Sequence, residues 1–175
     1  LTMTIVPRST IVSGTKTYDG TTNVASSNLT SFSNLAGSDT LSLSGTGTIS
    51  TADVGTGKTV NASGLTIDNS SGVGSNYTLS AATVNVTERV IGLSGVRAFD
   101  GTNNASSADL SISNLVSGEN LTLSGSATVP NATVEMNKAS TLGSLSISDG
   151  SGGKSSIILL IVFGAPLVCN VPKTT

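Results

Sequence analysis

Tyr18-Asp19-Gly20-Thr21 returns further along the chain as Phe99-Asp100-Gly101-Thr102. The two copies stand about eighty residues apart, and the segments that follow them match in the same order. The matching pairs are Asn34-Leu35 with Asn114-Leu115, Leu41-Ser42-Leu43-Ser44-Gly45 with Leu121-Thr122-Leu123-Ser124-Gly125, Lys58 with Lys138, and Leu65-Thr66-Ile67 with Leu145-Ser146-Ile147. A repeat of this length predicts two tandem domains, residues 1–88 with a leading connector strand and residues 89–175.

The composition favours strands over helices. Ser, Thr, Gly and Asn are abundant, and no long segment keeps a 3.6-residue apolar period. Thr, Val and Ile prefer extended backbone because they are branched at Cβ. Aromatic residues are 3% of the chain and tryptophan is absent, so the cores must rely on Val, Ile, Leu and Ala. We therefore expect two small all-β domains, either β-sandwiches or β-grasp-like sheets.

A strand pattern marks the junctions of the repeat. Thr2 to Val12 is apolar around Pro7-Arg8, which predicts an edge strand interrupted at the proline. The pattern returns at Thr83–Ile91 and faintly at Asn170–Lys173. One strand is thus expected to close one unit and open the next. Such a junction predicts an elongated, end-to-end array.

Alternation predicts further strands inside the first unit. Leu41 and Ile49 belong to a strand with one buried face. Ser63-Gly64 is expected to form a bulge that resets the apolar phase. Tyr77, Leu79 and Ala81 are expected to start a last strand that changes phase before Val84. Helices should be few.

The repeated motif is interpreted as an aromatic core anchor followed by a tight turn. Its glycine suits a turn that needs a positive φ, and its aspartate can cap that turn. Tyr in one copy and Phe in the other both supply apolar surface, so the phenol hydroxyl is not expected to carry chemistry. A ligand or calcium role for the two aspartates is the alternative. The motif residues are Tyr18, Asp19, Gly20, Thr21, Phe99, Asp100, Gly101 and Thr102.

Several function classes are disfavoured. The chain has no histidine and a single cysteine, Cys169, so it can form neither an internal disulfide nor a Cys/His zinc site. Its net charge is -2 and charged residues are 10%, which gives no basic footprint for nucleic acid. Nucleophile–histidine pairs are ruled out, and acids are scattered singly. We expect no cofactor and no enzymatic activity.

Three local patterns offer alternative sites. Gly55–Thr59 is similar to the end of a phosphate-binding loop, but Ala52 stands where the first glycine is required. An intramolecular Lys–Asn cross-link, as in some surface adhesins, stays open for Lys16 or Lys58. Acidic residues near turns could bind calcium, although turn capping is the simpler interpretation. These acids are Asp39, Asp53, Asp68, Asp109, Glu119 and Asp149.

Several motifs in the same order resemble the YDG domain, which recurs in tandem in large bacterial surface and secreted proteins, many of them filamentous-haemagglutinin-like adhesins. The motifs are Lys16–Thr22, Leu41–Gly47, Val54–Val60, Ser63–Leu65 and Ser75–Leu79. The resemblance covers nearly all of the first unit and most of the second. The second unit departs from it at Val134-Glu135-Met136-Asn137-Lys138 and again after Ser156. The resemblance to the YDG domain implies a small β-rich stalk or adhesion module without catalytic residues.

The tail from about residue 156 fails to repeat. Ile157–Val171 is apolar but too short, and too interrupted by Gly, Pro and Asn, to span a membrane. Ile157-Ile158-Leu159 is what a one-base shift in codons for Asn-Tyr-Thr would produce. A frame-shifted end is therefore one hypothesis for the tail, and the coding DNA tests it.

These patterns together predict a non-catalytic stalk module of an extracellular bacterial surface protein, whose partners are neighbouring repeats. The alternative is a binding module that recognises a host glycan or protein through loops or a sheet edge. We expect the chain to be part of a longer protein.

Overall fold

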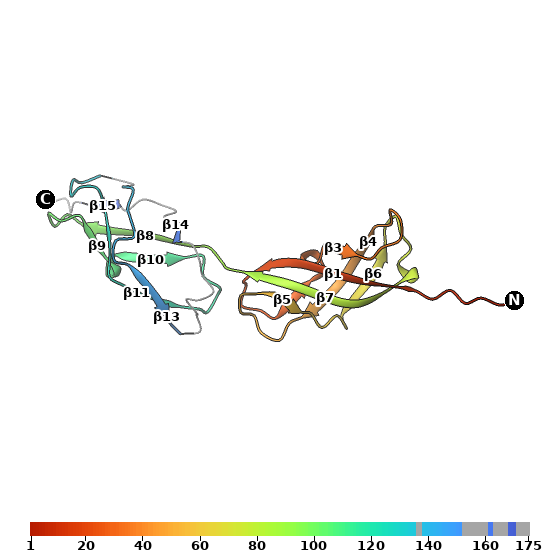
Figure 1. The fold of residues 1–175 in the computed structure, drawn as a ribbon. Helices are drawn as coiled ribbons and strands as arrows, with labels where there is room; N and C mark the ends of the chain where they lie inside the picture. Colours follow the sequence, from red (N-terminus) through yellow and green to blue (C-terminus); the bar gives the residue numbers. More distant parts are fainter. Residues whose placement is uncertain (136–137, 152–160, 163–167, 171–175) are drawn as a thin grey trace. The chain divides into compact units, whose positions relative to one another are not determined.

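The computed structural model describes residues 1–135, 138–151, 161–162 and 168–170. The chain divides into two compact units, 1–88 and 89–175. The described residues are built mainly of β-strands with three short 3-10 turns, so the all-β expectation is confirmed (Figure 1). Apart from residues 161–162 and 168–170, the tail after residue 156 lies outside the described residues. Ile157-Ile158-Leu159, on which the frameshift hypothesis rests, is among the residues left out.

Unit one contains two sheets. The first has the order β3-β1-β7-β5, and the second has the order β2-β4-β6. Buried side chains come from both sheets, which fits two-layer β-packing better than a single sheet covered by a helix. The strands are β1 (Arg8–Thr17), β2 (Asn23–Ala25), β3 (Ser31–Ser33), β4 (Leu41–Thr48), β5 (Gly55–Thr59), β6 (Leu65–Asn69) and β7 (Tyr77–Thr87), and the 3-10 turns are η1 (Ser26–Asn28) and η2 (Gly74–Asn76).

The prediction of an edge strand at Thr2–Val12 is wrong. Strand β1 starts only at Arg8, and it lies inside its sheet between β3 and β7. Its pairing with β7 is parallel and runs from Arg8↔Tyr77 to Thr17↔Thr87 (Figure 1). A parallel partner seventy positions away leaves no local sequence signal, because periodicity reports burial and not pairing.

The two predicted phase changes are present, each in a modified form; the one in β7 comes before Ala81, which is exposed, and not after it. The register of β1 and β7 shifts after Thr10, where Ser80 is the extra residue and its hydroxyl donates to Thr10 O (2.9 Å). The predicted bulge at Ser63-Gly64 is instead a turn, closed by a hydrogen bond from Leu65 N to Ala62 O (2.9 Å). The turn still adds one residue opposite the continuous strand β4.

Unit two repeats this pattern with shorter strands. Strand β8 takes the place of β1 and pairs with β10 on one side and, in parallel, with β14 and β15 on the other. The strand expected to join the units is interrupted, since β7 ends at Thr87 and β8 starts at Ile91. The elements are β8 (Ile91–Ala98), β9 (Asn104–Ser106), η3 (Ser107–Asp109), β10 (Leu110–Ser113), β11 (Leu121–Ser124), β12 (Ser126–Thr128), β13 (Ser146–Asp149), β14 (Ile161–Val162) and β15 (Val168–Asn170).

Candidate functional site

The polar groups of the repeated motif converge on a buried lysine. Alternation along β1 places Lys16 on the same face as the buried residues Thr10 and Val12, so its aliphatic stem lies in the core and only 4% of the residue is exposed. Its Nζ lies 2.8 Å from Asp19 Oδ1 and donates to the main-chain oxygens of Thr21 (3.0 Å) and Asn23 (2.6 Å). The lysine thus closes the loop that follows its own strand.

The aspartate completes the turn from the other side. Asp19 Oδ1 accepts hydrogen bonds from both the N–H and the hydroxyl of Thr21, each at 2.9 Å. Partial burial is the largest single influence on this carboxyl and opposes its ionisation. Hydrogen bonds from Lys16 and Thr21 together outweigh burial and hold the pKa of Asp19 below its usual value. Gly20 has φ 75°, as predicted for the turn.

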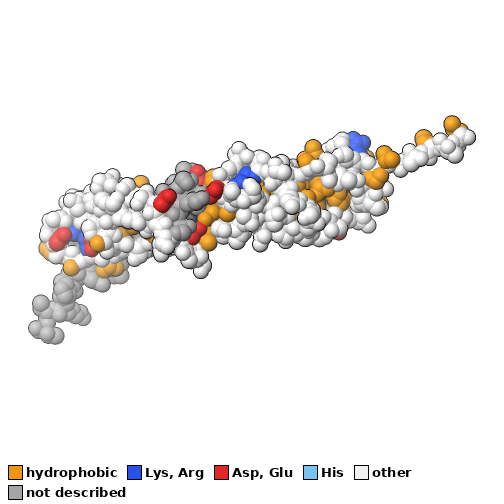
Figure 2. All heavy atoms as spheres, turned by 90° about the horizontal axis from the view of Figure 1, so that it is seen from below, with side chains coloured by type: hydrophobic (Ala, Val, Ile, Leu, Met, Phe, Trp, Pro, Cys, Tyr) orange, Lys and Arg blue, Asp and Glu red, His pale blue; other side chains and the backbone are white. Residues whose placement is uncertain are grey.

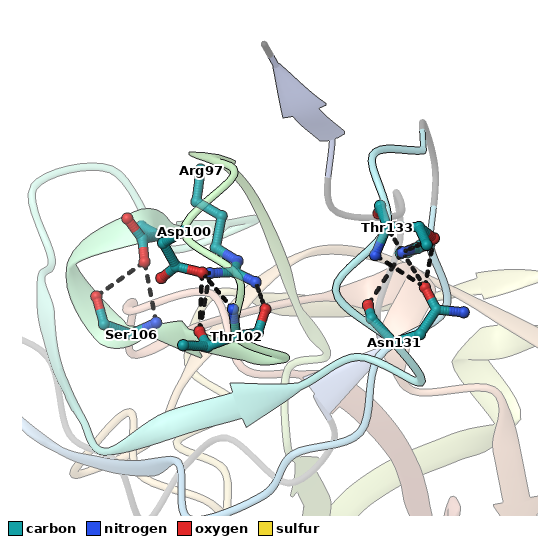
Figure 3. Close-up of polar contacts among 8 residues, drawn as sticks. Arg97, Asp100, Thr102, Ser106, Asn131 and Thr133 are labelled. Carbon is teal, nitrogen blue, oxygen red and sulfur yellow. Dashed lines mark hydrogen bonds and ion pairs between the residues drawn. The ribbon is translucent and has the colours of Figure 1, made fainter.

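The second copy of the motif uses arginine in place of lysine. Arg97, on the buried face of β8, donates to Asp100 Oδ1, to the main-chain oxygen of Thr102 and to its hydroxyl (3.2 Å) (Figure 3). The Thr102 N–H, then Arg97 and the Thr102 hydroxyl, lower the pKa of Asp100 to about 2. Gly101 has φ 79°. The predicted capping role of both aspartates is confirmed, and the cation is the partner that sequence reasoning missed.

The aromatic residues of the two copies differ in burial. Tyr18 is 6% exposed, as predicted for a core anchor, whereas Phe99 is 54% exposed. The prediction that Phe99 anchors the second core is therefore wrong. In unit one the backbone at Tyr18 extends the β1–β7 pairing, with Tyr18 N donating to Thr87 O (2.8 Å). Among the described residues, the parallel partner β15 ends opposite Ala98 and does not reach Phe99.

A second cation closes another loop in each unit. Lys58 Nζ donates to Thr51 O (2.8 Å), Thr51 Oγ1 (3.0 Å) and Asp53 O (2.5 Å). Lys138, 7% exposed, donates in the same way to the main-chain oxygens of Asn131 (3.0 Å) and Thr133. The sequence repeat pairs these two lysines, and the structure gives the reason: each holds the carbonyls of a loop seven residues upstream.

An arginine–asparagine clamp also recurs and was not anticipated. Asn34 has φ 64° and donates from Nδ2 to Ser9 O (2.6 Å), while Arg8 donates from Nε to Asn34 O (2.8 Å) and from its terminal nitrogen to Asn34 Oδ1 (2.9 Å). Arg89 and Asn114 make the same bonds at the start of β8. The clamp ties the start of a strand, Arg8 of β1 or Arg89 just before β8, to the end of its antiparallel neighbour. In the sequence, the matched pairs Asn34-Leu35 and Asn114-Leu115 were the signal that pointed to these two positions.

The other candidate sites have structural partners. Gly55–Thr59 forms strand β5 rather than a phosphate loop, and its lysine is bound to its own loop. Asp39 accepts from the Tyr77 hydroxyl (2.5 Å), and this hydrogen bond raises the pKa of Tyr77 although a bond from Ala36 N–H opposes it. Asp109 caps η3 by accepting from Ser106. Asp109 therefore acts as a cap, as the simpler interpretation predicts, whereas Asp39 binds a tyrosine hydroxyl from another strand.

The described residues hold no group of three or more His, Cys, Asp or Glu suited to a metal ion. On the face drawn in Figure 2, charged side chains lie in small separate groups. In the described part of the chain, no helix is both long enough and apolar enough to cross a membrane. Chemically, the cations donate hydrogen bonds to the main-chain oxygens of the loops and so hold the loops in place.

Comparison with known proteins gives one result. The family model of the YDG domain matches residues 2–85 and again residues 87–156. No curated protein and no solved structure matches the chain. The second match ends where the tail stops following the repeat.

Proposed function

The chain belongs to the YDG domain family, and from this premise we propose that it is a non-catalytic structural and adhesive repeat module, part of the stalk of a large bacterial surface or secreted adhesin. In this proposal the protein acts outside the cell, and its partners are neighbouring repeats of the same parent protein. A stalk of this kind predicts an elongated molecule in solution, and a solution-scattering curve of the whole chain tests this, since a globular profile would contradict it.

The parallel pairing of first and last strands supports the proposal most strongly. Because β1 and β7 lie side by side and run the same way, the chain enters unit one at one end and leaves it at the other (Figure 1). Ten paired residues at about 3.3 Å each separate these points by about 33 Å. Tension along the chain then pulls the two strands past each other. All hydrogen bonds between them resist together, which suits a stalk.

Single-molecule pulling tests the mechanical part of the proposal. Pulled through residues 8 and 87, unit one is expected to rupture in one step that releases about 240 Å of chain. Pulled through residues 45 and 65, which face each other on β4 and β6, the same unit should open strand by strand at a lower force. Equal forces in the two directions would contradict a stalk built around β1 and β7.

The contacts of the ionisable side chains support the proposal that the module is non-catalytic. Lys16, Lys58, Arg97 and Lys138 all donate to main-chain oxygens of their own loops. The aspartates of the motif are engaged by these cations and by threonine. Reactive groups poised toward an open cleft would instead favour an enzyme.

A binding module for a host glycan or protein remains the second candidate. Strands β3 and β6 lie at sheet edges, and a hollow lined by Pro7, Asp39 and Tyr77 joins apolar and polar groups. An edge strand can accept an extended peptide as an added strand. A glycan array and a mucin pull-down with the intact chain separate the candidates. If Asp39→Ala or substitutions in the edge strands β3 and β6 abolish binding, a binding module is favoured over a purely structural stalk.

A further inference from the structure

Lys138 differs from the other loop-closing cations in what its amine touches. Nζ also contacts the side-chain oxygen of Asn131, and Glu135 Oε2 lies 3.9 Å from it. The matching loop of unit one has Thr51 in the place of Asn131 and Gly55 in the place of Glu135. The departure of unit two from the repeat therefore assembles an amine, a carboxamide and a carboxylate at one point.

From this cluster we propose that Lys138 and Asn131 form an intramolecular amide bond, with Glu135 as the proton carrier. The Nζ attacks Cγ of Asn131, a C–N bond forms, the bond from Cγ to the amide nitrogen breaks, and ammonia leaves. Glu135 first takes a proton from the ammonium of Lys138 and passes it to solvent; it then takes a second proton from the attacking nitrogen and delivers it to the departing nitrogen. No oxidant or other reactant is needed.

The geometry around the carboxamide suits this attack. Asn131 Oδ1 accepts hydrogen bonds from the N–H (3.2 Å) and the hydroxyl (2.5 Å) of Thr133, which polarise the carbonyl and would stabilise the oxyanion that develops on it (Figure 3). Because Nζ also contacts Oδ1, it stands beside the carbon that it attacks. Lys138 is 7% exposed, so the amine is shielded from water, whereas Glu135 is 62% exposed and exchanges protons with solvent.

Lys16 and Lys58, for which the sequence leaves a cross-link open, do not have this arrangement. Lys16 donates to the main-chain oxygen of Asn23, and Lys58 donates to Thr51 and Asp53, so neither amine is shown on a carboxamide. Arg97 offers a guanidinium, a poor nucleophile that stays protonated. Lys58, in the equivalent loop, is thus an internal control for Lys138 within the same molecule.

Mass spectrometry of the denatured full chain tests the proposal. Loss of one ammonia lowers the intact mass by about 17 Da, and trypsin should cut after Lys58 but not after Lys138. Lys138→Arg and Asn131→Ala should each restore the mass calculated from their sequences, and Glu135→Gln should leave most of the protein unlinked. An unchanged wild-type mass, a gain of about 1 Da from deamidation, or a loss that maps to other residues would overturn it.

Discussion

At the scale of single residues, the chain has few charged side chains, and several of them bind the main-chain oxygens of loops. Lys16 and Arg97 stand in the apolar phase of an alternating strand, where only an aliphatic residue is expected. Burying a cation costs free energy unless carbonyls and a carboxylate replace its water. The turn after each strand supplies those oxygens, so cation and turn stabilise each other.

Replacing the buried lysine tests this dependence. Lys16→Met keeps the apolar stem but leaves the main-chain oxygens of Thr21 and Asn23 without their donor. We expect a loss of about 2–4 kcal/mol in the free energy of unfolding. Lys16→Arg is the matched control, since Arg97 does the same work in unit two, and it should cost less than about 1 kcal/mol. Urea unfolding followed by tyrosine fluorescence measures both, and a Met variant as stable as wild type would refute the role.

The aspartates predict loss of stability in acid. Asp100 has its pKa lowered to about 2, and that of Asp19 is also lowered, so the folded state holds these protons less tightly than the unfolded chain does. The contribution of the two aspartates to the free energy of unfolding is complete above the unfolded pKa of about 4. It disappears as the pH falls from there toward 2. The double variant Asp19→Asn, Asp100→Asn should show a flatter fall in urea midpoint between pH 4 and 2. Parallel falls in variant and wild type would exclude these carboxylates as the cause.

At the scale of elements, periodicity predicted where strands run but not which strands they meet. The phases of β4 and β7 were readable because buried and exposed positions alternate. The place of β1 inside its sheet was not, since its parallel partner lies at the far end of the unit. The repeat marked Asn34 and Asn114 as matching positions, but their arginine partners were not predicted, because each lies about twenty-five residues away in the sequence.

The clamp gives a prediction for the contact between β1 and β3. Asn34→Gly keeps the positive φ but loses the bonds to Ser9 and the side-chain bond from Arg8, which should cost about 1–2 kcal/mol. Asn34→Ala loses the same bonds and adds backbone strain of about 1 kcal/mol. The order of urea midpoints should be Asn, then Gly, then Ala. A variant order with alanine above glycine would show that φ does not matter there.

At the scale of the whole molecule, one sequence pattern gives two units whose strands differ in length. The repeat predicted two domains, and equal motifs led to an equal role for Tyr18 and Phe99. The structure buries only Tyr18. Burial of the aromatic residue depends on strands from the other end of its unit, which the motif itself does not encode. In unit one β1 has ten residues and β4 has eight, whereas in unit two β8 has eight, and the counterparts of β4, β11 and β12, have four and three.

Unit two should therefore unfold before unit one, and the chain carries a probe for the difference. Both tyrosines, Tyr18 and Tyr77, belong to unit one, and tryptophan is absent, so tyrosine fluorescence reports unit one alone while far-UV circular dichroism reports both. If unit two is less stable by about 2 kcal/mol, its urea midpoint should lie about 1 M lower, and the dichroism should fall before the fluorescence changes. Tyr77→Phe removes one probe and the bond to Asp39, and it should move only the later transition. Coincident transitions by the two signals would mean that the shorter strands of unit two do not weaken it, or that the two units unfold as one.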